Sequence, residues 1–244
     1  MSAVAVAAAQ PELASRVAQI AWREAQLELD ARGFAGLGLL LSRRECTALE
    51  ALYAEPLFRS TVIMQRHGFG SGEYKYFADP LPPLVQGLRQ EIYPHLVPIA
   101  NDWEQRLKTG RQFPDTLGEL REQCRALGQQ QPTPLLLRYG PDDYNCLHQD
   151  LYGELVFPLQ LCVLLSEPGA DFEGGEFLMN EQRPRMQSRG EVVPLVQGGA
   201  VVFATRHRPV QGVRGTYRTN LKHGVSRIRS GKRFTLGIIF HDAT

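Results

Sequence analysis

The residues after Pro132 constrain the fold most, because short apolar segments alternate there with Gly, Pro and polar residues. Each segment spans five to seven residues, a usual length for a β-strand and too short for a typical helix. Eight short strands at this spacing, without helical crossovers, favour an antiparallel sandwich or jelly roll. We predict strands at Leu135–Tyr139, Cys146–Asp150, Leu159–Leu165, Gly175–Asn180, Glu191–Leu195, Ala200–Ala204, Gly224–Ile228 and Phe234–Phe240.

Residues 1–131 have a mainly helical pattern, in which apolar residues recur at helical spacing. Strand-like residues on both sides of a glycine-rich turn also predict a hairpin over about residues 60–78. We therefore expect one α+β domain, with residues 1–131 as helical support on one face of a jelly-roll core formed by residues 132–244. The predicted helices are Glu12–Arg32, Ser42–Ala54, Leu84–Lys108, which Pro94 and Pro98 should kink or split, and Thr116–Leu127.

The charge of the chain is unevenly distributed along the sequence. The formal net charge is +1, but residues 183–244 carry 12 Lys or Arg and only two acidic residues. This excess predicts a polyanionic partner, with nucleic acid bound by a basic C-terminal face. An equally supported alternative is that the acidic helices cover a basic sheet, so that the charges pair within the fold.

The cysteines and the apolar segments indicate the compartment. The four cysteines show no C-x-x-C spacing, which favours free thiols over a disulfide framework or a zinc ribbon. No apolar run is long enough to span a membrane, and the first residues lack the basic region of a secretory signal. We expect a cytoplasmic protein that does not interact with membranes.

Three residues of the β-rich region form a candidate metal site. His148 and Asp150 are two residues apart, so they point to the same face of a strand. His223 lies at the head of a later strand and can complete the two-His, one-carboxylate triad of non-haem Fe(II) oxygenases. His207 is a weaker candidate for the third ligand because Arg206 and Arg208 flank it.

Arg233, at the start of the last strand, supports this interpretation. An anionic cosubstrate bound to iron needs its far carboxylate held inside the barrel, and a guanidinium can bind it in a bidentate manner. Thr235 and Gly237 share the face of Arg233, so they can add a hydroxyl donor and leave space. Chance placement of common residues is the alternative explanation.

The His148-x-Asp150, His223 and Arg233-x-Thr235 elements resemble those of the 2-oxoglutarate/Fe(II)-dependent dioxygenase superfamily. The resemblance extends over about residues 135–242. It implies a double-stranded β-helix, with Fe(II), 2-oxoglutarate and O₂ as cofactor and cosubstrates. It also implies that His148, Asp150 and His223 bind the metal.

Two groups within the superfamily share further elements with this chain. Arg138–Pro141, followed by His148-Gln149-Asp150, resembles AlkB-type nucleic-acid demethylases, which implies that Tyr139 touches 2-oxoglutarate. Asp171–Phe177 and Gly198–Phe203 are similar to strands of prolyl hydroxylases. As a whole, the chain most resembles bacterial oxygenases linked to oxidative removal of alkyl damage from DNA.

The resemblance to AlkB-type enzymes also suggests which residues contact a substrate. The hairpin is similar to their nucleotide-gripping lid, where aromatic stacking and phosphate neutralisation are needed. The basic segment before His223 should be a loop at the rim of the iron pocket. The candidate substrate-binding residues are Met64, Arg66, His67, Tyr74, Tyr76, Arg206, Arg208, Arg214 and Arg218.

These features predict a dioxygenase that hydroxylates or demethylates alkylated nucleic acid, as in DNA repair. A hydroxylase acting on a protein side chain, of the prolyl type, or on a small molecule would use the same iron site. A non-catalytic nucleic-acid-binding module is a third possibility, which the intact triad disfavours. His241, beyond the last predicted strand, is expected to be exposed.

Overall fold

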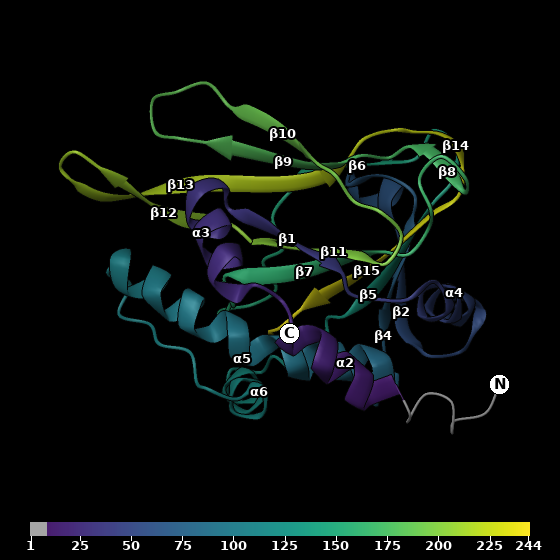
Figure 1. The fold of residues 1–244 in the computed structure, drawn as a ribbon, viewed down its shortest axis with the longest axis horizontal. Coiled ribbons are helices and arrows are strands. Elements are labelled where there is room, and N and C mark those ends of the chain that lie inside the picture. The colour runs from purple at the N-terminus through teal and green to yellow at the C-terminus, as the bar shows by residue number, and fades with distance from the viewer. Residues whose placement is uncertain (1–8) are drawn as a thin grey trace.

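A computed structural model describes residues 9–244. Two sheets, formed by antiparallel strand pairs, lie face to face (Figure 1). The larger sheet has the strand order β1-β11-β7-β15-β5-β4-β2. Its strands are β1 (Phe34–Leu39), β2 (Phe58–Ile63), β4 (Glu73–Phe77), β5 (Leu135–Tyr139), β7 (Leu159–Leu164), β11 (Gly199–Ala204) and β15 (Arg233–Ile239).

The smaller sheet has the order β10-β9-β13-β6-β3, and a further strand, β12, pairs with β13. This arrangement confirms the predicted jelly roll and the α+β class. Its strands are β3 (Gly70–Ser71), β6 (Tyr144–His148), β9 (Phe177–Gln182), β10 (Arg189–Val193), β12 (His207–Gly212) and β13 (Gly215–Val225), and a separate ribbon pairs β8 (Phe172–Gly174) with β14 (Ile228–Gly231).

Helices cover the outer face of the larger sheet, where α2, α5 and α6 lie together (Figure 1). Every residue of β7 and β11 is buried, because these strands lie between the helices and the second sheet. No described helix has the length and apolar character needed to cross a membrane. The helices are α2 (Ala9–Ala18), α3 (Trp22–Arg32), α4 (Arg43–Ala51), α5 (Pro83–Arg106) and α6 (Leu117–Ala126).

Several predicted elements differ from the structure. The predicted helix Glu12–Arg32 is two helices, α2 and α3, with a break after Ala18. Pro94 and Pro98 lie inside an unbroken α5, whose many buried side chains hold it against the sheet despite the lost hydrogen bonds. The capping box that begins α4 is present, with the Ser42 side chain accepting from the Glu45 backbone N–H.

The predicted lid hairpin belongs to the larger sheet. β4 pairs with β2 on one side and with β5 on the other, so these strands extend the sheet. The connection between β2 and β4 includes a 3-10 turn over Met64–His67 and the short β3. Within this connection, β3 pairs with β6 of the smaller sheet. The connection therefore spans the gap between the two sheets at one end of the sandwich.

The basic segment before His223, expected to be a loop, is a hairpin made of β12 and β13. Pro209 lies within β12 and lacks the N–H that a central strand would need. β12 tolerates the proline because β13 is its only strand partner among the described residues. The β12–β13 hairpin and the β9–β10 hairpin both project from one end of the molecule (Figure 1).

Candidate active site

Two histidines from adjacent strands face an aspartate in the gap between the sheets. His148 ends β6 and lies directly opposite His223 of β13, with the ring centroids 4.1 Å apart. Asp150 follows two residues after His148, and one ligand atom from each residue lies within 4.8 Å of the other two. These donors are the nitrogen and oxygen types that suit a divalent transition metal.

Both imidazoles direct Nε2 at the Asp150 carboxylate. The distances are 3.5 Å from His148 and 3.3 Å from His223. His148 Nδ1 lies 2.8 Å from the Cys146 carbonyl oxygen, so Nδ1 carries the proton and Nε2 keeps a lone pair for a metal. Burial alone would raise the pKa of Asp150, but the two imidazoles beside its carboxylate outweigh this effect and hold the pKa well below its usual value.

Arg233 lies in the same cavity and has no acidic partner among the described residues. It is 1% exposed, its Nη1 donates to Thr235 Oγ1 at 2.5 Å, and its Nε has no hydrogen-bond partner. Burial lowers the pKa of the guanidinium, as expected for a buried charge that nothing neutralises. Gly175, at φ 63°, allows close packing here, since a Cβ would lie 2.9 Å from Arg233 Cδ. A buried cation of this kind fits an anionic ligand such as a dicarboxylate.

The triad and Arg233 share one cavity of about 310 Å³, a size suited to small molecules. Thr235 and Gly237 line it together with Arg233, in agreement with the alternation expected for the last strand. Tyr139 also lines it from β5, directly opposite Arg233 in the register. The structure therefore brings all six predicted metal- and cosubstrate-binding residues to one cavity.

The comparisons with known proteins agree with this geometry. Residues 72–243 match the model of a family described as "Oxygenase, catalysing oxidative methylation of damaged DNA". The chain belongs to this oxygenase family. A Mycobacterium tuberculosis protein, Rv2227, described as uncharacterized, is 51% identical over 167 residues, which cover 68% of this chain and 72% of that protein.

Solved structures show the same fold at low sequence identity. A Burkholderia pseudomallei oxidoreductase of the 2OG-Fe(II) oxygenase family superimposes with a TM-score of 0.56 at 13% identity, covering 93% of this chain and 94% of that one. A Trichoplax adhaerens prolyl hydroxylase gives 0.55 at 12% identity, covering 95% and 92%. The protein is thus an oxygenase by its family, shares its fold with 2OG-Fe(II) oxygenases, and carries a His-Asp-His triad that can hold a metal ion such as Fe(II).

The segment that follows the triad aspartate is held in place from behind. The Tyr152 hydroxyl donates to Asp150 Oδ1 at 2.7 Å. The Gln129 amide nitrogen lies within hydrogen-bond distance of the carbonyl oxygens of Tyr152, Leu155 and Asp242, and its oxygen accepts from the Leu155 N–H. Gln129 thereby ties the segment of the oxygenase that carries Asp150 to the C-terminal end of the chain.

Replacing Tyr152 with phenylalanine is expected to weaken Fe(II) binding by the oxygenase about 10-fold, because a carboxylate ligand loses the hydrogen bond that orients it. Titration of the anaerobic apoprotein with Fe(II), with bound metal measured after equilibrium dialysis, checks this. Tyr217→Phe, in the β12–β13 hairpin, is the control and should bind iron like the wild type. Equal affinities for all three proteins would contradict a positioning role for Tyr152.

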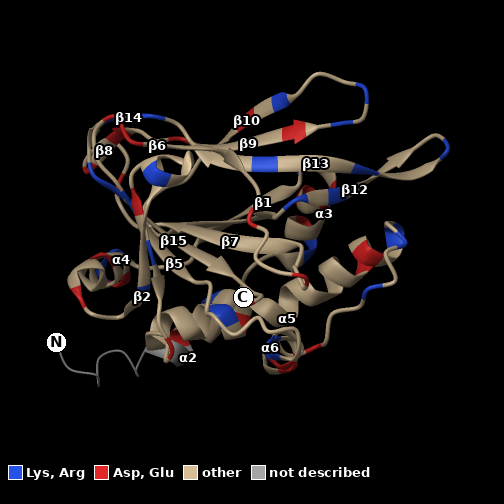
Figure 2. Ribbon diagram, turned by 180° about the vertical axis from the view of Figure 1, so that it is seen from behind, with Lys and Arg blue, Asp and Glu red and all other residues tan. Residues whose placement is uncertain are grey.

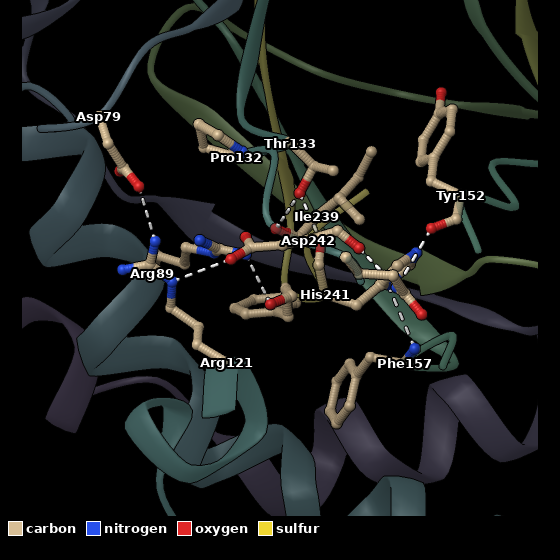
Figure 3. Close-up of polar contacts among 12 residues, drawn as sticks. Asp79, Arg89, Arg121, Pro132, Thr133, Tyr152, Phe157, Ile239, His241 and Asp242 are labelled. Atoms are coloured by element: carbon tan, nitrogen blue, oxygen red, sulfur yellow. Dashed lines mark hydrogen bonds and ion pairs between the residues drawn. The ribbon is translucent and has the colours of Figure 1, made fainter. Parts of the chain in front are cut away.

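An ion-pair network beneath this segment anchors the last residues (Figure 3). Asp242, 1% exposed, accepts from Arg89 at 2.6 Å and from Arg121 at 3.0 Å, and Arg121 also pairs with Asp79. Neighbouring His241 is buried, contrary to the prediction, and its Nδ1 accepts from the Phe157 N–H. Burial lowers the pKa of His241 to about 4, so this side chain is neutral in the folded oxygenase at neutral pH.

Removing the Asp242 carboxylate should destabilise the protein strongly. Asp242→Ala leaves the fully buried Arg89 without a counter-charge, which typically costs about 3–5 kcal/mol of unfolding free energy. Asp102→Ala, which breaks a partly exposed pair with Arg106, should cost less than about 1 kcal/mol. Urea unfolding measures both, and similar small losses for the two variants would contradict the importance of the buried network.

The hairpin residues proposed to contact substrate have different environments. Met64 is fully buried in a small apolar cluster, so it cannot stack on a base as predicted. Tyr74 lines the cavity, and Tyr76 is 7% exposed, packed edge-on against both Tyr74 and Tyr152. Tyr76 therefore packs behind the residues that line the active site and has little exposed surface on which a substrate could stack.

Arg66 and His67 lie in the exposed connection between β2 and β4. The His67 ring stacks on Phe69 with centroids 5.3 Å apart. Phe69 was not predicted, although it is 46% exposed and lines the oxygenase cavity. An aromatic residue between two glycines at a hairpin tip is the signal that could have identified it.

Lys and Arg positions mark the β12–β13 hairpin (Figure 2), but the four arginines of this segment have different environments. Arg208 is 1% exposed, pairs with Glu181 and donates to the Asp30 carbonyl oxygen at 2.6 Å. It therefore stabilises the fold, and the prediction of substrate contact is wrong for this residue. Arg206, Arg214 and Arg218 are exposed, and none forms an ion pair within the described part of the chain. Only part of the basic charge is thus neutralised internally.

Other cavity residues were missed because they lie on strands whose inner face the sequence does not indicate. Phe203 of β11 and Phe177 of β9 pack beside His223, with ring centroids 4.7 and 6.0 Å away. His223 Nδ1 has no hydrogen-bond partner within residues 9–244, so aromatic packing holds this imidazole. These rings make one wall of the oxygenase site apolar.

Proposed function

We propose that this oxygenase oxidises an alkyl group on a nucleic-acid base and thereby removes it. The observation that carries the proposal is the family match, whose description refers to damaged DNA. In addition, an aromatic residue, Phe69, lies at the mouth of the iron cavity. Half-exposed Phe69, backed by His67, offers a stacking surface at that point, and Arg66 adds an exposed cation in the same connection. Stacking on aromatic side chains is the usual way to hold a base taken out of its helix.

Six residues have defined roles in this proposal. His148, Asp150 and His223 would hold Fe(II), while Arg233, Thr235 and Tyr139 would hold 2-oxoglutarate. When bound, the metal and cosubstrate supply the activation of O₂, and the protein positions the substrate and limits access of water. Overall, an N-methylated base, 2-oxoglutarate and O₂ yield the unmethylated base, formaldehyde, succinate and CO₂.

The cavity suits an apolar alkyl group next to the metal. Phe177, Phe203 and Leu161 line it, so water has few hydrogen-bonding partners on this part of the lining. Tyr74 of β4, in the same sheet as Phe203 and Leu161, adds a further aromatic ring to the lining. A base held between Tyr74 and Phe69 would place a ring substituent toward the triad.

A protein side chain is the second candidate substrate. The observation that favours it is the likeness to a prolyl hydroxylase structure, a likeness of fold alone. A hydroxylase for a small molecule would need no contacts outside the cavity. The family match favours nucleic acid over both.

A substrate screen tests the proposal. The Fe(II)-loaded protein is given 2-oxoglutarate with methylated DNA, methylated RNA, proline-rich peptides or no addition, and succinate is measured. We expect methylated nucleic acid to stimulate succinate formation well above the unmethylated strand and the peptides. Stimulation by peptides alone would contradict the proposal and favour a protein hydroxylase.

A further inference from the structure

A second cavity opens beside the iron site, and the proposed mechanism does not use it. It has a volume of about 400 Å³ and lies between the end of α5, residues 151–158 and the start of β12. Leu151 lines both this groove and the iron cavity, so the two are neighbours that share a wall. Leu151 is itself 40% exposed, which places the shared wall at the surface.

The groove is lined by three arginines from separate parts of the chain: Arg111, Arg206 and Arg218. All three are exposed, and none forms an ion pair with a described residue. Among the described residues, the Arg111 guanidinium donates only to the Glu154 carbonyl oxygen, at 3.4 Å. Two acidic residues, Glu104 and Glu154, also line the groove, but neither forms an ion pair with its arginines within the described residues, and the guanidinium groups outnumber the carboxylates three to two. The cationic groups therefore remain available to a ligand.

His207, on the wall of the groove, responds to this positive charge. Burial lowers its pKa most, and the charges of Arg206 and Arg218 lower it further, to about 4. A hydrogen bond with the Thr219 carbonyl oxygen acts in the opposite direction and does not compensate. The same positive potential that disfavours a proton on His207 attracts an anion.

We propose that this groove binds a phosphodiester of the nucleic-acid backbone, next to the nucleotide whose base enters the iron cavity. The inference rests on the proposed function and adds a subsite to it. Arginine suits phosphate because its planar guanidinium can donate two parallel hydrogen bonds. Because Leu151 lines both the groove and the iron cavity, the two sites are adjacent, as neighbouring nucleotides of one nucleic-acid strand would require.

The subsite separates the arginines of the basic hairpin by role. Arg206 and Arg218 lie in the groove, whereas Arg208 is buried against Glu181 and Arg214 lies in the turn before β13. Arg111, which comes from the connection after α5, joins them although it lies about 100 residues away in sequence. Arg111 therefore reaches the groove only because the fold brings the connection after α5 next to the β12–β13 hairpin.

Binding of a labelled single-stranded methylated oligonucleotide tests the subsite directly. Fluorescence anisotropy of the whole protein at several salt concentrations gives both affinity and its salt dependence. Arg206→Ala and Arg218→Ala should each weaken binding about 10-fold and reduce the slope of log K against log salt by about 0.7, the value for one phosphate contact on a single strand. Arg44→Ala, an exposed arginine of α4 at the other end of the molecule, should leave both unchanged.

The outcomes separate this inference from the proposed function. If the wild type oxidises and binds the oligonucleotide but the two groove variants behave like Arg44→Ala, the subsite is wrong and the function stands. If the wild type neither binds nor oxidises nucleic acid, both are wrong. A polyglutamate peptide serves as the second probe, and equally tight, groove-dependent binding of it would overturn the assignment to nucleic acid in favour of an acidic protein segment.

Discussion

Replacing Asp150 with alanine is expected to abolish both Fe(II) binding and substrate-dependent formation of succinate. Asp150 is the one anionic member of the triad, and both imidazoles direct Nε2 at its carboxylate. Without it, two neutral nitrogen donors remain, too few for the facial arrangement of two histidines and a carboxylate. The loss should exceed the roughly 10- to 100-fold that changes to outer hydrogen-bond partners cost.

Metal content and activity should be measured on the same Asp150→Ala sample. Asp115→Ala, which removes an exposed carboxylate with no ion pair in the described structure, is the matched control and should retain both. A far-UV circular dichroism spectrum shows whether the fold is preserved. Retention of one tightly bound iron per chain by a folded Asp150→Ala protein would contradict the assignment of the metal ligands.

Replacing Arg233 with alanine is expected to raise the concentration of 2-oxoglutarate needed for half-maximal rate by a large factor. The guanidinium is 1% exposed and has only Thr235 as a hydrogen-bond partner among residues 9–244, so a bound carboxylate would be its counter-charge. Truncating one partner of a buried charged pair costs about 2–5 kcal/mol, which corresponds to roughly 30-fold to several-thousand-fold in affinity.

Two further variants make the Arg233 experiment specific. Arg233→Lys keeps the charge but not the paired donors, so its requirement for 2-oxoglutarate should lie between those of wild type and Arg233→Ala. Arg229→Ala, which removes an exposed side chain of β14 four residues earlier, should match the wild type. An unchanged 2-oxoglutarate requirement in Arg233→Ala would show that another group anchors the cosubstrate.

The arrangement of the candidate site was predictable because strand periodicity determines which side chains share a face. Arg233 and Thr235 are two residues apart on β15 and both reach the cavity, whereas Asp150 reaches it from beyond the end of β6, which ends at His148 and not at Asp150 as predicted. The short apolar segments separated by Gly and Pro likewise predicted the jelly roll, which is confirmed. Leu135–Tyr139 forms a strand with the predicted bounds.

Features that depend on pairing between distant segments could not be predicted in this way. The basic segment around Arg208 has the composition of a loop, yet β12 and β13 pair, and Glu181 from β9 neutralises the buried guanidinium. β1 was missed because its Gly-rich sequence lacks strand alternation, and its pairing with β11 stabilises it. His241 was expected to be exposed because no local pattern reveals that α5 and residues 151–158 cover it.

The measurement that tests the central claim most directly is the stoichiometry of a coupled reaction on an oligonucleotide with a single N-methylated base. Intact mass spectrometry of the strand and quantification of succinate are made on the same sample over time. The account predicts that each succinate formed matches one methyl group lost, and that Asp150→Ala yields neither. Succinate formed while the methylated strand keeps its mass would contradict it.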